Sequence, residues 1–372
     1  MKRIAIIVPG GISLENSEYS IPFLQNLISN LSQQFDLTVY SLSKVPVSRD
    51  LPFILKCTDS SPKSFIFKRI LKICFLIYRD HRLKKFDILH GFWAFPSGFL
   101  VVILSKIFRN KSIVTLLGGE AAAIPEIGYG NMLKSHLKKI TFMTCRLTNE
   151  LIAPTHFLKD QLTFFGFQRK SIRIIPFGAD TNLFKPIEKA DFPPVNFIHI
   201  GNLTPVKDQK TLLRAFKLIQ KRRNCELRII GPDYFEGELQ RLAKELKIES
   251  KVKFLGPLLN HEIVNHLNWA HIMLHTSLYE GQAVVIAEAA ASGVVVCGTR
   301  VGLLSDLGDE KAVTVDIGDY NSLAKEVLKL INDKNRYKQI RQNAFNWAEQ
   351  YSAEWTAGKY KSLYLKLVKN NG

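Results

Sequence analysis

Two glutamates eight positions apart, Glu280 and Glu288, are the groups of this chain best placed to do chemistry. They lie in the sequence SLYEGQAVVIAEAAASG, directly after the short apolar run Ile272–Leu274. The apolar run predicts a buried strand, and the sequence after it predicts a loop followed by a helix that begins near Gln282 or Ala283. Glu280 would then lie in the loop and Glu288 in the helix.

This arrangement suits the recognition of a sugar and a phosphate by one loop. Gly281 lets the backbone approach a ligand closely, and the N–H groups at a helix start favour an anion. Glu280 could accept hydrogen bonds from sugar hydroxyls, and Glu288 could accept them from a ribose diol. The pattern predicts a nucleotide sugar as the ligand. The alternative is a surface helix with two solvated glutamates, which an isolated pair at this spacing would favour.

A third candidate, Lys207, lies between a predicted strand and a predicted helix in FIHIGNLTPVKDQKTLLRAF. The strand Phe197–Ile200 would end at Gly201, and Asn202 would follow in the loop. A lysine at this place can neutralise a pyrophosphate leaving group. Most single lysines are solvated, but the order of strand, glycine, loop, lysine and helix favours the functional interpretation.

Other loops that follow predicted strands carry further candidates. For the nucleotide these are Gly231, Phe254 and Leu255, and for an acceptor they are Gly10, Gly11, His90, Gly118, Gly119 and Glu120. A lone histidine is more often structural than catalytic. In IIPFGADTNLFKP, Gly178 suits a tight turn, and Asp180 is interpreted as the residue that orders it through its side chain.

The motifs that are absent narrow the chemistry. No Asp-x-Asp occurs in the chain, so we expect no divalent metal bridged to a diphosphate and no cofactor. The charge of a leaving phosphate would then be met by cations and N–H groups, for which Lys207 and the helix start at Gln282 are the candidates. There is also no Ser-His-Asp order, H-E-x-x-H motif or phosphate-binding GKS or GKT loop.

The composition indicates a globular protein of two domains. The chain has 372 residues, and 46% of them are hydrophobic. Its five cysteines are scattered without zinc spacing, which is typical of reduced thiols in a cytoplasmic protein. The apolar stretch Ile4–Val8 is too short for a signal peptide, and no run approaches the ~20 residues of a spanning helix. We expect a soluble or peripheral protein.

The net charge of +18 is concentrated in the first half of the chain. It is densest in Lys63–Lys85, where eight basic residues and a single acid, Asp80, alternate with apolar residues. Such a segment can lie on an anionic membrane surface, or it can be a core helix with a solvated basic face. The sequence of this segment alone supports these two interpretations equally. A nucleic-acid footprint is a third, but no nucleic-acid motif accompanies the charge.

Strands and amphipathic helices alternate along the chain, and the alternation restarts once. This predicts an α/β protein of two doubly wound Rossmann-like domains that face a cleft. The expected domains are 1–186, which binds the acceptor, and 187–352, which binds the nucleotide sugar. A C-terminal helix at about 353–372 is expected to pack back on the first domain.

SLYEGQAVVIAEAAASG, GNLTPVKDQKTLLRAF and IIPFGADTNLFKP together resemble glycosyltransferase family 4, a group with the GT-B fold. The resemblance implies retaining transfer of a sugar from a nucleotide diphosphate sugar, with the acceptor bound by the first domain and the donor by the second. It implies that Glu280 lies beside the donor sugar and that Glu288 holds the ribose. The backbone of residues 281–283 would contact sugar and phosphate, and Lys207 would contact the pyrophosphate. The departing phosphate would take the acceptor's proton.

Two positions depart from the pattern that the resemblance implies. Asn202 stands where the family often has an arginine, and Leu117 stands at or near a frequent histidine. An active enzyme with a lipid-linked or polysaccharide acceptor, peripheral at the inner face of a membrane, is the leading interpretation. The alternatives are a catalytically silent nucleotide-sugar-binding protein and a GT-B-fold epimerase, for which Glu120 and Glu126 would have to supply the acid and base. The sequence does not choose between UDP, GDP and ADP donors.

Overall fold

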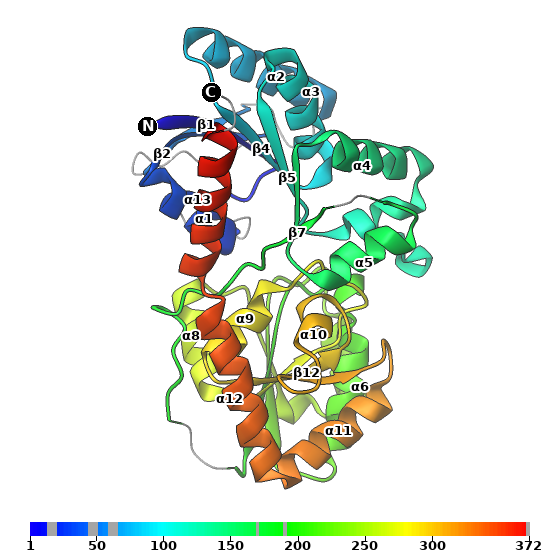
Figure 1. Ribbon diagram of the computed structural model, residues 1–372. Helices are drawn as coiled ribbons and strands as arrows, with labels where there is room; N and C mark the ends of the chain where they lie inside the picture. Colours follow the sequence, from blue (N-terminus) through cyan, green and yellow to red (C-terminus); the bar gives the residue numbers. More distant parts are fainter. Residues whose placement is uncertain (13–20, 44–50, 59–65, 169–170, 189–191, 370–372) are drawn as a thin grey trace. The chain divides into compact units, whose positions relative to one another are not determined.

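The protein consists of two compact units (Figure 1). The computed structural model describes residues 1–12, 21–43, 51–58, 66–168, 171–188 and 192–369. One unit comprises Met1–Pro176 and the end of the chain from Ala353, and the other comprises Phe177–Ser352. The expected return of the chain at residue 353 coincides with this division. The expected joint at residue 186 lies later than the observed one, because Phe177 already belongs to the second unit through two backbone hydrogen bonds with the Gln282 side chain.

The N-terminal unit is a parallel sheet with helices on both faces. Its strands are β1 Lys2–Val8, β2 Phe35–Ser41, β3 Ile54–Cys57, β4 Ile88–Phe92, β5 Lys111–Thr115, β6 Glu150–Ala153 and β7 Arg173–Ile174, in the spatial order β3-β2-β1-β4-β5-β6-β7. Its helices are α1 Pro22–Ser32, α2 Ile66–Leu83, α3 Phe99–Phe108, α4 Ser135–Leu147, α5 His156–Phe164 and α13 Ala353–Lys369. Successive strand residues point to opposite faces, so Leu89 packs in a cluster with α2 and α3, whereas His90 contacts α13.

The C-terminal unit repeats this architecture. Its strands are β8 Val195–Ile200, β9 Cys225–Ile230, β10 Val252–Gly256, β11 Ile272–His275, β12 Val295–Thr299 and β13 Val313–Val315, in the order β10-β9-β8-β11-β12-β13. Its helices are α6 Gln209–Gln220, α7 Glu238–Glu245, α8 Asn260–Trp269, α9 Val284–Ala291, α10 Gly302–Leu307, α11 Tyr320–Asn332 and α12 Lys334–Gln350. The predicted α/β class with two Rossmann-like parallel sheets is confirmed.

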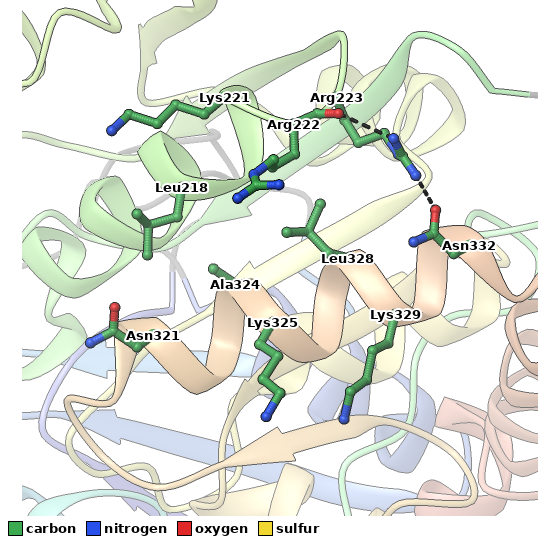
Figure 2. A pocket seen from close by; sticks show the side chains of 10 residues that line it. All are labelled: Leu218, Lys221, Arg222, Arg223, Asn321, Ala324, Lys325, Leu328, Lys329 and Asn332. Atoms are coloured by element: carbon green, nitrogen blue, oxygen red, sulfur yellow. Dashed lines mark hydrogen bonds between the residues drawn. The ribbon is translucent and has the colours of Figure 1, made fainter.

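Helices α6 and α11 lie side by side and leave a basic groove between them (Figure 2). The groove has a volume of about 650 Å³. Its lining includes Lys221, Arg222, Arg223, Lys325 and Lys329. At its floor, Leu218 and Leu328 are half-buried and Ala324 is buried.

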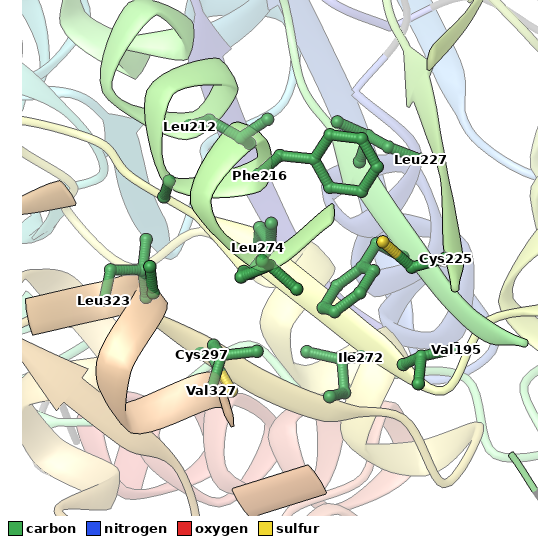
Figure 3. Close-up of a cluster of buried hydrophobic side chains, with 14 of the residues drawn as sticks. Val195, Leu212, Phe216, Cys225, Leu227, Ile272, Leu274, Cys297, Leu323 and Val327 are labelled. Atoms are coloured by element: carbon green, nitrogen blue, oxygen red, sulfur yellow. The ribbon is translucent and has the colours of Figure 1, made fainter. Parts of the chain in front are cut away.

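Beneath these two helices lies the larger core cluster of the C-terminal unit (Figure 3). Ile272 and Leu274 of β11 point into it, as does Phe216 of α6. Met273, between the two β11 residues, belongs to the cluster on the opposite face, under α8, α9, α10 and α12. Both faces of the strands are therefore apolar, which explains why strands of this sheet appear in the sequence as short unbroken apolar runs.

Candidate functional site

The loops that carry the candidate donor-binding residues leave two neighbouring strands where the strand order reverses. β8 and β11 pair with each other, and the chain then continues from β8 to β9 on one side and from β11 to β12 on the other. Ligands of doubly wound sheets bind beyond the carboxyl ends of the strands at this place. Gly201 and Asn202 follow β8, and Glu280 follows β11. The structure thus brings together residues that are far apart in the sequence.

One oxygen of the Glu280 carboxylate gathers three polar partners. Oε1 accepts from Lys207 Nζ at 2.5 Å and from Ser277 Oγ at 2.6 Å, and His275 Nε2 lies 3.1 Å away. Within the part of the chain that the structure describes, no donor contacts the other oxygen, Oε2. The network fixes the carboxylate by one oxygen and leaves the second for a ligand.

Glu280 is ionised although it is only 9% exposed. Burial by itself would raise its pKa, but the Lys207 charge and the His275 hydrogen bond hold the pKa of Glu280 well below its usual range. Lys207 is half-buried beside it and contributes one of its three protons to the ion pair. The other two protons are available for a phosphate group.

The loop around Glu280 is held by bonds to neighbouring segments. Thr276 Oγ1 donates to the carbonyl oxygen of Asp208 at 2.9 Å, and Leu278 N donates to the Val206 carbonyl oxygen at 2.8 Å. These bonds attach the loop after β11 to the short turn that carries Lys207. The distance between Glu280 and Lys207 is therefore set by the fold.

Four polar residues of this site were not predicted from the sequence: His199, Gln209, His275 and Ser277. The two histidines stand within otherwise apolar strands, FIHI and IMLH, near the carboxyl end of each. A polar residue at such a place is the signal that could have identified them.

His199 and Gln209 organise the backbone below the site. His199 is completely buried, and burial lowers its pKa to about 3, so the ring is neutral. Its Nδ1 lies 2.9 Å from the carbonyl oxygen of Leu274, and its Nε2 lies 3.2 Å from Gln209 Nε2. Because Gln209 Nε2 also donates to the Asn202 carbonyl oxygen at 3.0 Å, this chain of contacts connects the loop after β8 to β11.

Gly302 at the start of α10 packs directly against the Glu280 side chain. Its φ is +53°, and a Cβ at this position would lie 2.6 Å from Glu280 Cβ. Leu303 N donates to the Gln282 carbonyl oxygen at 3.0 Å, which holds α10 against the loop. Only glycine fits here without moving Glu280.

Helix α9 begins at Val284, one or two residues later than expected, after Ala283 in a left-handed conformation with φ +65°. Gln282 is part of the turn, but its side chain points elsewhere: Oε1 accepts from Phe177 N at 2.9 Å and Nε2 donates to the Phe177 carbonyl oxygen at 2.6 Å. The predicted contribution of Gly281, Gln282 and Ala283 to ligand binding is therefore restricted to their backbone, where the first turn of a helix offers N–H groups.

Glu288 lies in the second turn of α9 and is half-buried. No hydrogen-bond donor contacts its carboxyl group among the residues that the structure describes. Burial raises the pKa of Glu288 to about 7. The predicted contact between Glu288 and a ribose diol stays a prediction.

Gly201 and Gly231 allow the ends of β8 and β9 to come close together. Gly231 has φ +143°, and a Cβ there would lie 2.1 Å from the Gly201 carbonyl oxygen. A Cβ at Gly201 would lie 3.7 Å from Lys207 Cε, so Gly201 borders the lysine. Asn202 is exposed next to these residues. Its position agrees with a role in donor binding, which stays a prediction.

Phe254 and Leu255, predicted to contact a base, lie half-buried in β10. The Phe254 side chain packs against one core cluster and that of Leu255 against the cluster on the opposite face. The packing leaves mainly their backbone for a base. The structural interpretation of Asp180 is confirmed, because its Oδ1 accepts from Asn182 N at 3.0 Å.

The acceptor-side candidates of the N-terminal unit differ in how they are placed. Gly10 and Gly11 follow β1, at the place where the strand order of the N-terminal sheet reverses. Gly11 has φ +83°, and a side chain at this position would clash with Ile21. His90 is completely buried, with Nδ1 2.6 Å from Tyr364 Oη and Nε2 2.8 Å from Thr115 Oγ1. This burial does not support contact between His90 and an acceptor.

Glu120 serves the backbone of its own loop. It is buried, and its carboxyl oxygens accept from Gly118 N at 2.6 Å and from Leu117 N and Ala94 N at 3.2 Å each. Burial raises the pKa of Glu120, against these hydrogen bonds. The burial of Glu120 and these bonds to its own loop favour the structural interpretation over contact with a sugar. Gly119 lies beside the Tyr129 ring, where a Cβ would approach to 2.9 Å.

Two known protein families match this chain, one mainly in each of its two units. The family described as Glycosyltransferase Family 4 matches residues 23–183, and the one described as Glycosyl transferases group 1 matches residues 180–347. The chain belongs to the family 4 glycosyltransferases. It is an enzyme that transfers a sugar from a nucleotide sugar.

Individual relatives and solved structures agree with this assignment. The N-acetyl-alpha-D-glucosaminyl L-malate synthase of Bacillus anthracis is 25% identical over 296 residues, which cover 77% of this glycosyltransferase and 76% of the relative. Sucrose-phosphate synthase of Thermosynechococcus elongatus superposes with a TM-score of 0.86 at 17% identity over 100% of both chains. Anabaena HepE in complex with UDP-glucose superposes with a TM-score of 0.76 at 18% identity over 98% of this chain and 100% of HepE. The structural likeness supports the expected GT-B fold.

Proposed function

We propose that this glycosyltransferase transfers its sugar with retention of anomeric configuration, without a metal, to a lipid-linked or polysaccharide acceptor. The observation that carries the proposal is the Glu280 carboxylate, held through Oε1 by Lys207, Ser277 and His275 with Oε2 left open. This geometry supports the proposal, because a carboxylate that could accept sugar hydroxyls lies beside a cation that could contact phosphate, and a reaction at the sugar–phosphate bond uses both.

In the proposed donor complex, Glu280 Oε2 accepts from sugar hydroxyls and Glu288 from the ribose diol. Lys207 and the N–H groups at the start of α9 contact the diphosphate. The bond between the anomeric carbon and the phosphate oxygen breaks, and its electron pair passes to the diphosphate. The acceptor hydroxyl attacks from the same face, and its proton passes to the departing phosphate oxygen. Lys207 stabilises the charge that develops there.

Absence of an Asp-x-Asp motif supports the metal-independent part of the proposal, because it removes the usual carboxylates for a diphosphate-bound cation. The acceptor class is supported by one relative. A Campylobacter jejuni enzyme, 22% identical over 87% of this chain and 90% of its own length, is named for a diphospho-undecaprenol acceptor. A lipid-linked acceptor would place this enzyme at the cytoplasmic face of a membrane, as a peripheral protein.

The test is nucleoside diphosphate release from UDP-, GDP- and ADP-sugars by the purified protein, with and without candidate acceptors. We expect one donor class to be turned over, with no change on addition of EDTA, and NMR of the product to show the donor's anomeric configuration. An inverted product would remove the retaining mechanism, and loss of turnover with EDTA would remove metal independence.

The competing function is nucleotide-sugar binding without transfer, which the exposed Asn202 favours because it brings no positive charge to the leaving group. Calorimetric binding of a nucleotide sugar that is neither transferred nor hydrolysed would establish it. The epimerase alternative gains no support, since Glu120 is bound to three backbone N–H groups and Glu126 is exposed.

Gly302→Ala is expected to lower transfer by roughly tenfold to a hundredfold, because the added methyl group displaces Glu280 and small displacements of reacting groups are costly. Initial rates at saturating donor measure the effect. Gly308→Ala is the matched control: Gly308 also has a positive φ, +65°, but has open space around it. Both variants put a side chain at a positive φ, so equal loss of activity in both would show that contact with Glu280 is unimportant.

Donor binding is expected to strengthen by up to about tenfold between about pH 6 and about pH 8. Burial raises the pKa of Glu288 to about 7, and the carboxylate, which forms as the pH rises, accepts both ribose hydroxyls. Calorimetry with an intact nucleotide sugar measures the affinity without titration of the ligand in this range. Glu288→Gln should bind more weakly with a flat profile. An unchanged pH dependence in that variant would assign the titration to another group.

A further inference from the structure

We propose that the outer face of α2, α3 and α4 docks on a surface of anionic phospholipid. We define the outer face by fourteen of the exposed side chains of these helices: Phe67, Lys68, Leu71, Phe75, Tyr78, Arg79, Arg82, Ile103, Lys106, Ile107, Lys139, Met143, Arg146 and Leu147. This inference deepens the proposed function, and its biological purpose rests on it, because a lipid-linked acceptor resides in a membrane. Docking itself is measured without any sugar transfer.

Helix α2 has two clearly different sides. Ile73 and Ile77 are completely buried against the sheet. Phe67, Leu71 and Phe75 recur every four residues on the opposite side and are 65%, 53% and 62% exposed. The sequence left membrane contact and a core helix with a solvated basic face as equal interpretations of Lys63–Lys85. The described part of this segment is a helix from Ile66 to Leu83, and Lys63 to Phe65 lie outside the described residues. It has both a core side and a second apolar side.

The neighbouring helices extend this exposed apolar side. α3 packs between α2 and α4, and it exposes Ile103 and Ile107. α4 exposes Met143 and Leu147. Three adjacent helices on one face of the sheet therefore present large apolar side chains to solvent. Soluble proteins keep contiguous patches of this kind small unless a partner or a membrane covers them.

The charge of the outer face has a single sign. Lys68, Arg79 and Arg82 of α2, Lys106 of α3, and Lys139 and Arg146 of α4 are all exposed. The described residues of the three helices include one acid, Asp80, which is 3% exposed. Its carboxylate binds Lys56, Tyr40 and Arg79, and these hydrogen bonds hold its pKa below the usual range although burial opposes this. No exposed carboxylate opposes an anionic surface on these helices as described.

Basic and apolar side chains mixed on one face distinguish a lipid surface from other anionic partners. The apolar groups can enter the boundary between headgroups and acyl chains while lysine and arginine contact phosphate. No described helix has the length and apolarity needed to cross a bilayer, so contact would be peripheral. Nucleic acid would use the charge but would leave Phe67 and Phe75 in water.

The C-terminal unit supplies a control for charge alone. The groove between α6 and α11 is also basic, through Lys221, Arg222, Arg223, Lys325 and Lys329, but its apolar residues Leu218 and Leu328 lie half-buried at its floor (Figure 2). If attraction between a basic protein and an anionic vesicle were the whole effect, both surfaces would contribute. If the outer face docks, the groove contributes little.

The experiment is sedimentation of the full chain with phosphatidylcholine vesicles that contain or lack phosphatidylglycerol. We expect binding only with phosphatidylglycerol. Phe67→Gln/Phe75→Gln and Lys68→Gln/Arg82→Gln should each weaken it at least about tenfold. Lys221→Gln/Lys325→Gln, which removes the same charge from the groove, should bind as the wild type does. These exposed positions leave the core unchanged, and circular dichroism checks the fold.

Three results would overturn the proposal: no sedimentation with phosphatidylglycerol vesicles, equal weakening by the groove variant, or full binding by the phenylalanine variant. Binding of RNA that the charge variant abolishes and the phenylalanine variant retains would assign the face to nucleic acid. Turnover of nucleotide sugar with water as acceptor is measured on the same proteins. Absence of turnover in all of them, both with water and with the candidate acceptors, would remove the proposed function while leaving the docking result intact.

Discussion

Lys207→Met is expected to lower kcat by about 100- to 1,000-fold, the range found when one preorganised donor to a developing anion is removed. Lys207 is the cation next to Glu280, and its turn is fixed by hydrogen bonds to the loop after β11. Without it, the leaving diphosphate keeps only N–H groups as partners in the proposed complex. Donor affinity should fall less than kcat, because the charge on the diphosphate grows as the bond to the sugar breaks.

Steady-state rates with the preferred donor measure this effect, and Lys210→Met is the matched control. Lys210 lies in the first turn of the next helix and pairs with Glu238 at 2.5 Å, and both side chains are partly exposed. The Lys210→Met variant should retain wild-type rates. Removal of Lys207 also removes the charge that lowers the pKa of Glu280. The pKa of Glu280 should therefore be higher in the variant, and its residual activity should fall at a higher pH on acidification than that of the wild type. A Lys207→Met enzyme with wild-type kcat would refute the assignment.

Glu280→Gln is expected to reduce kcat/KM by at least about 100-fold at nearly constant side-chain volume. The amide removes the negative charge that Lys207, Ser277 and His275 position, so the sugar hydroxyls lose a charged acceptor. Glu288→Gln should instead weaken donor binding with a smaller effect on kcat. The two glutamates are thus separated by which kinetic parameter changes.

The double variant Glu280→Gln/Lys207→Met tests whether the ion pair acts as one unit. Residues in direct contact give effects that do not add. We expect the double variant to lose much less than the product of the two single losses, because either change already disrupts the pair. Fully multiplicative losses, measured by kcat/KM under identical conditions, would show that the two side chains contribute independently.

The regular elements could be predicted where a strand is buried on both faces. The expected strands Phe197–Ile200 and Ile272–Leu274 lie within β8 and β11. β3 and β13 were not predicted, because they are short edge strands whose pairing depends on β2 and β12 and leaves no long apolar run in the sequence. Such pairing between distant strands cannot be predicted from the local sequence.

The candidate donor site was predictable only for residues that lie in recognisable loops. Glu280 and Lys207 belong to such loops, and the structure brings them within 2.5 Å. His275 and Gly302 join them through the positions of β11 and α10 in the fold, which no local pattern specifies. The burial of His90 could not be predicted for the same reason: α13, from the far end of the chain, covers it and supplies Tyr364 as its hydrogen-bond partner.

The central claim, that the Glu280–Lys207 pair performs sugar transfer from a nucleotide diphosphate sugar, is tested most directly by a single comparison. Glycoside formation is measured for the wild type and for Lys207→Met, both saturated with the preferred donor as verified by calorimetry. The account predicts transfer by the wild type and, in the variant, donor binding with transfer below about 1%. Equal transfer by both proteins, or donor binding by the wild type without any transfer or hydrolysis, would contradict it.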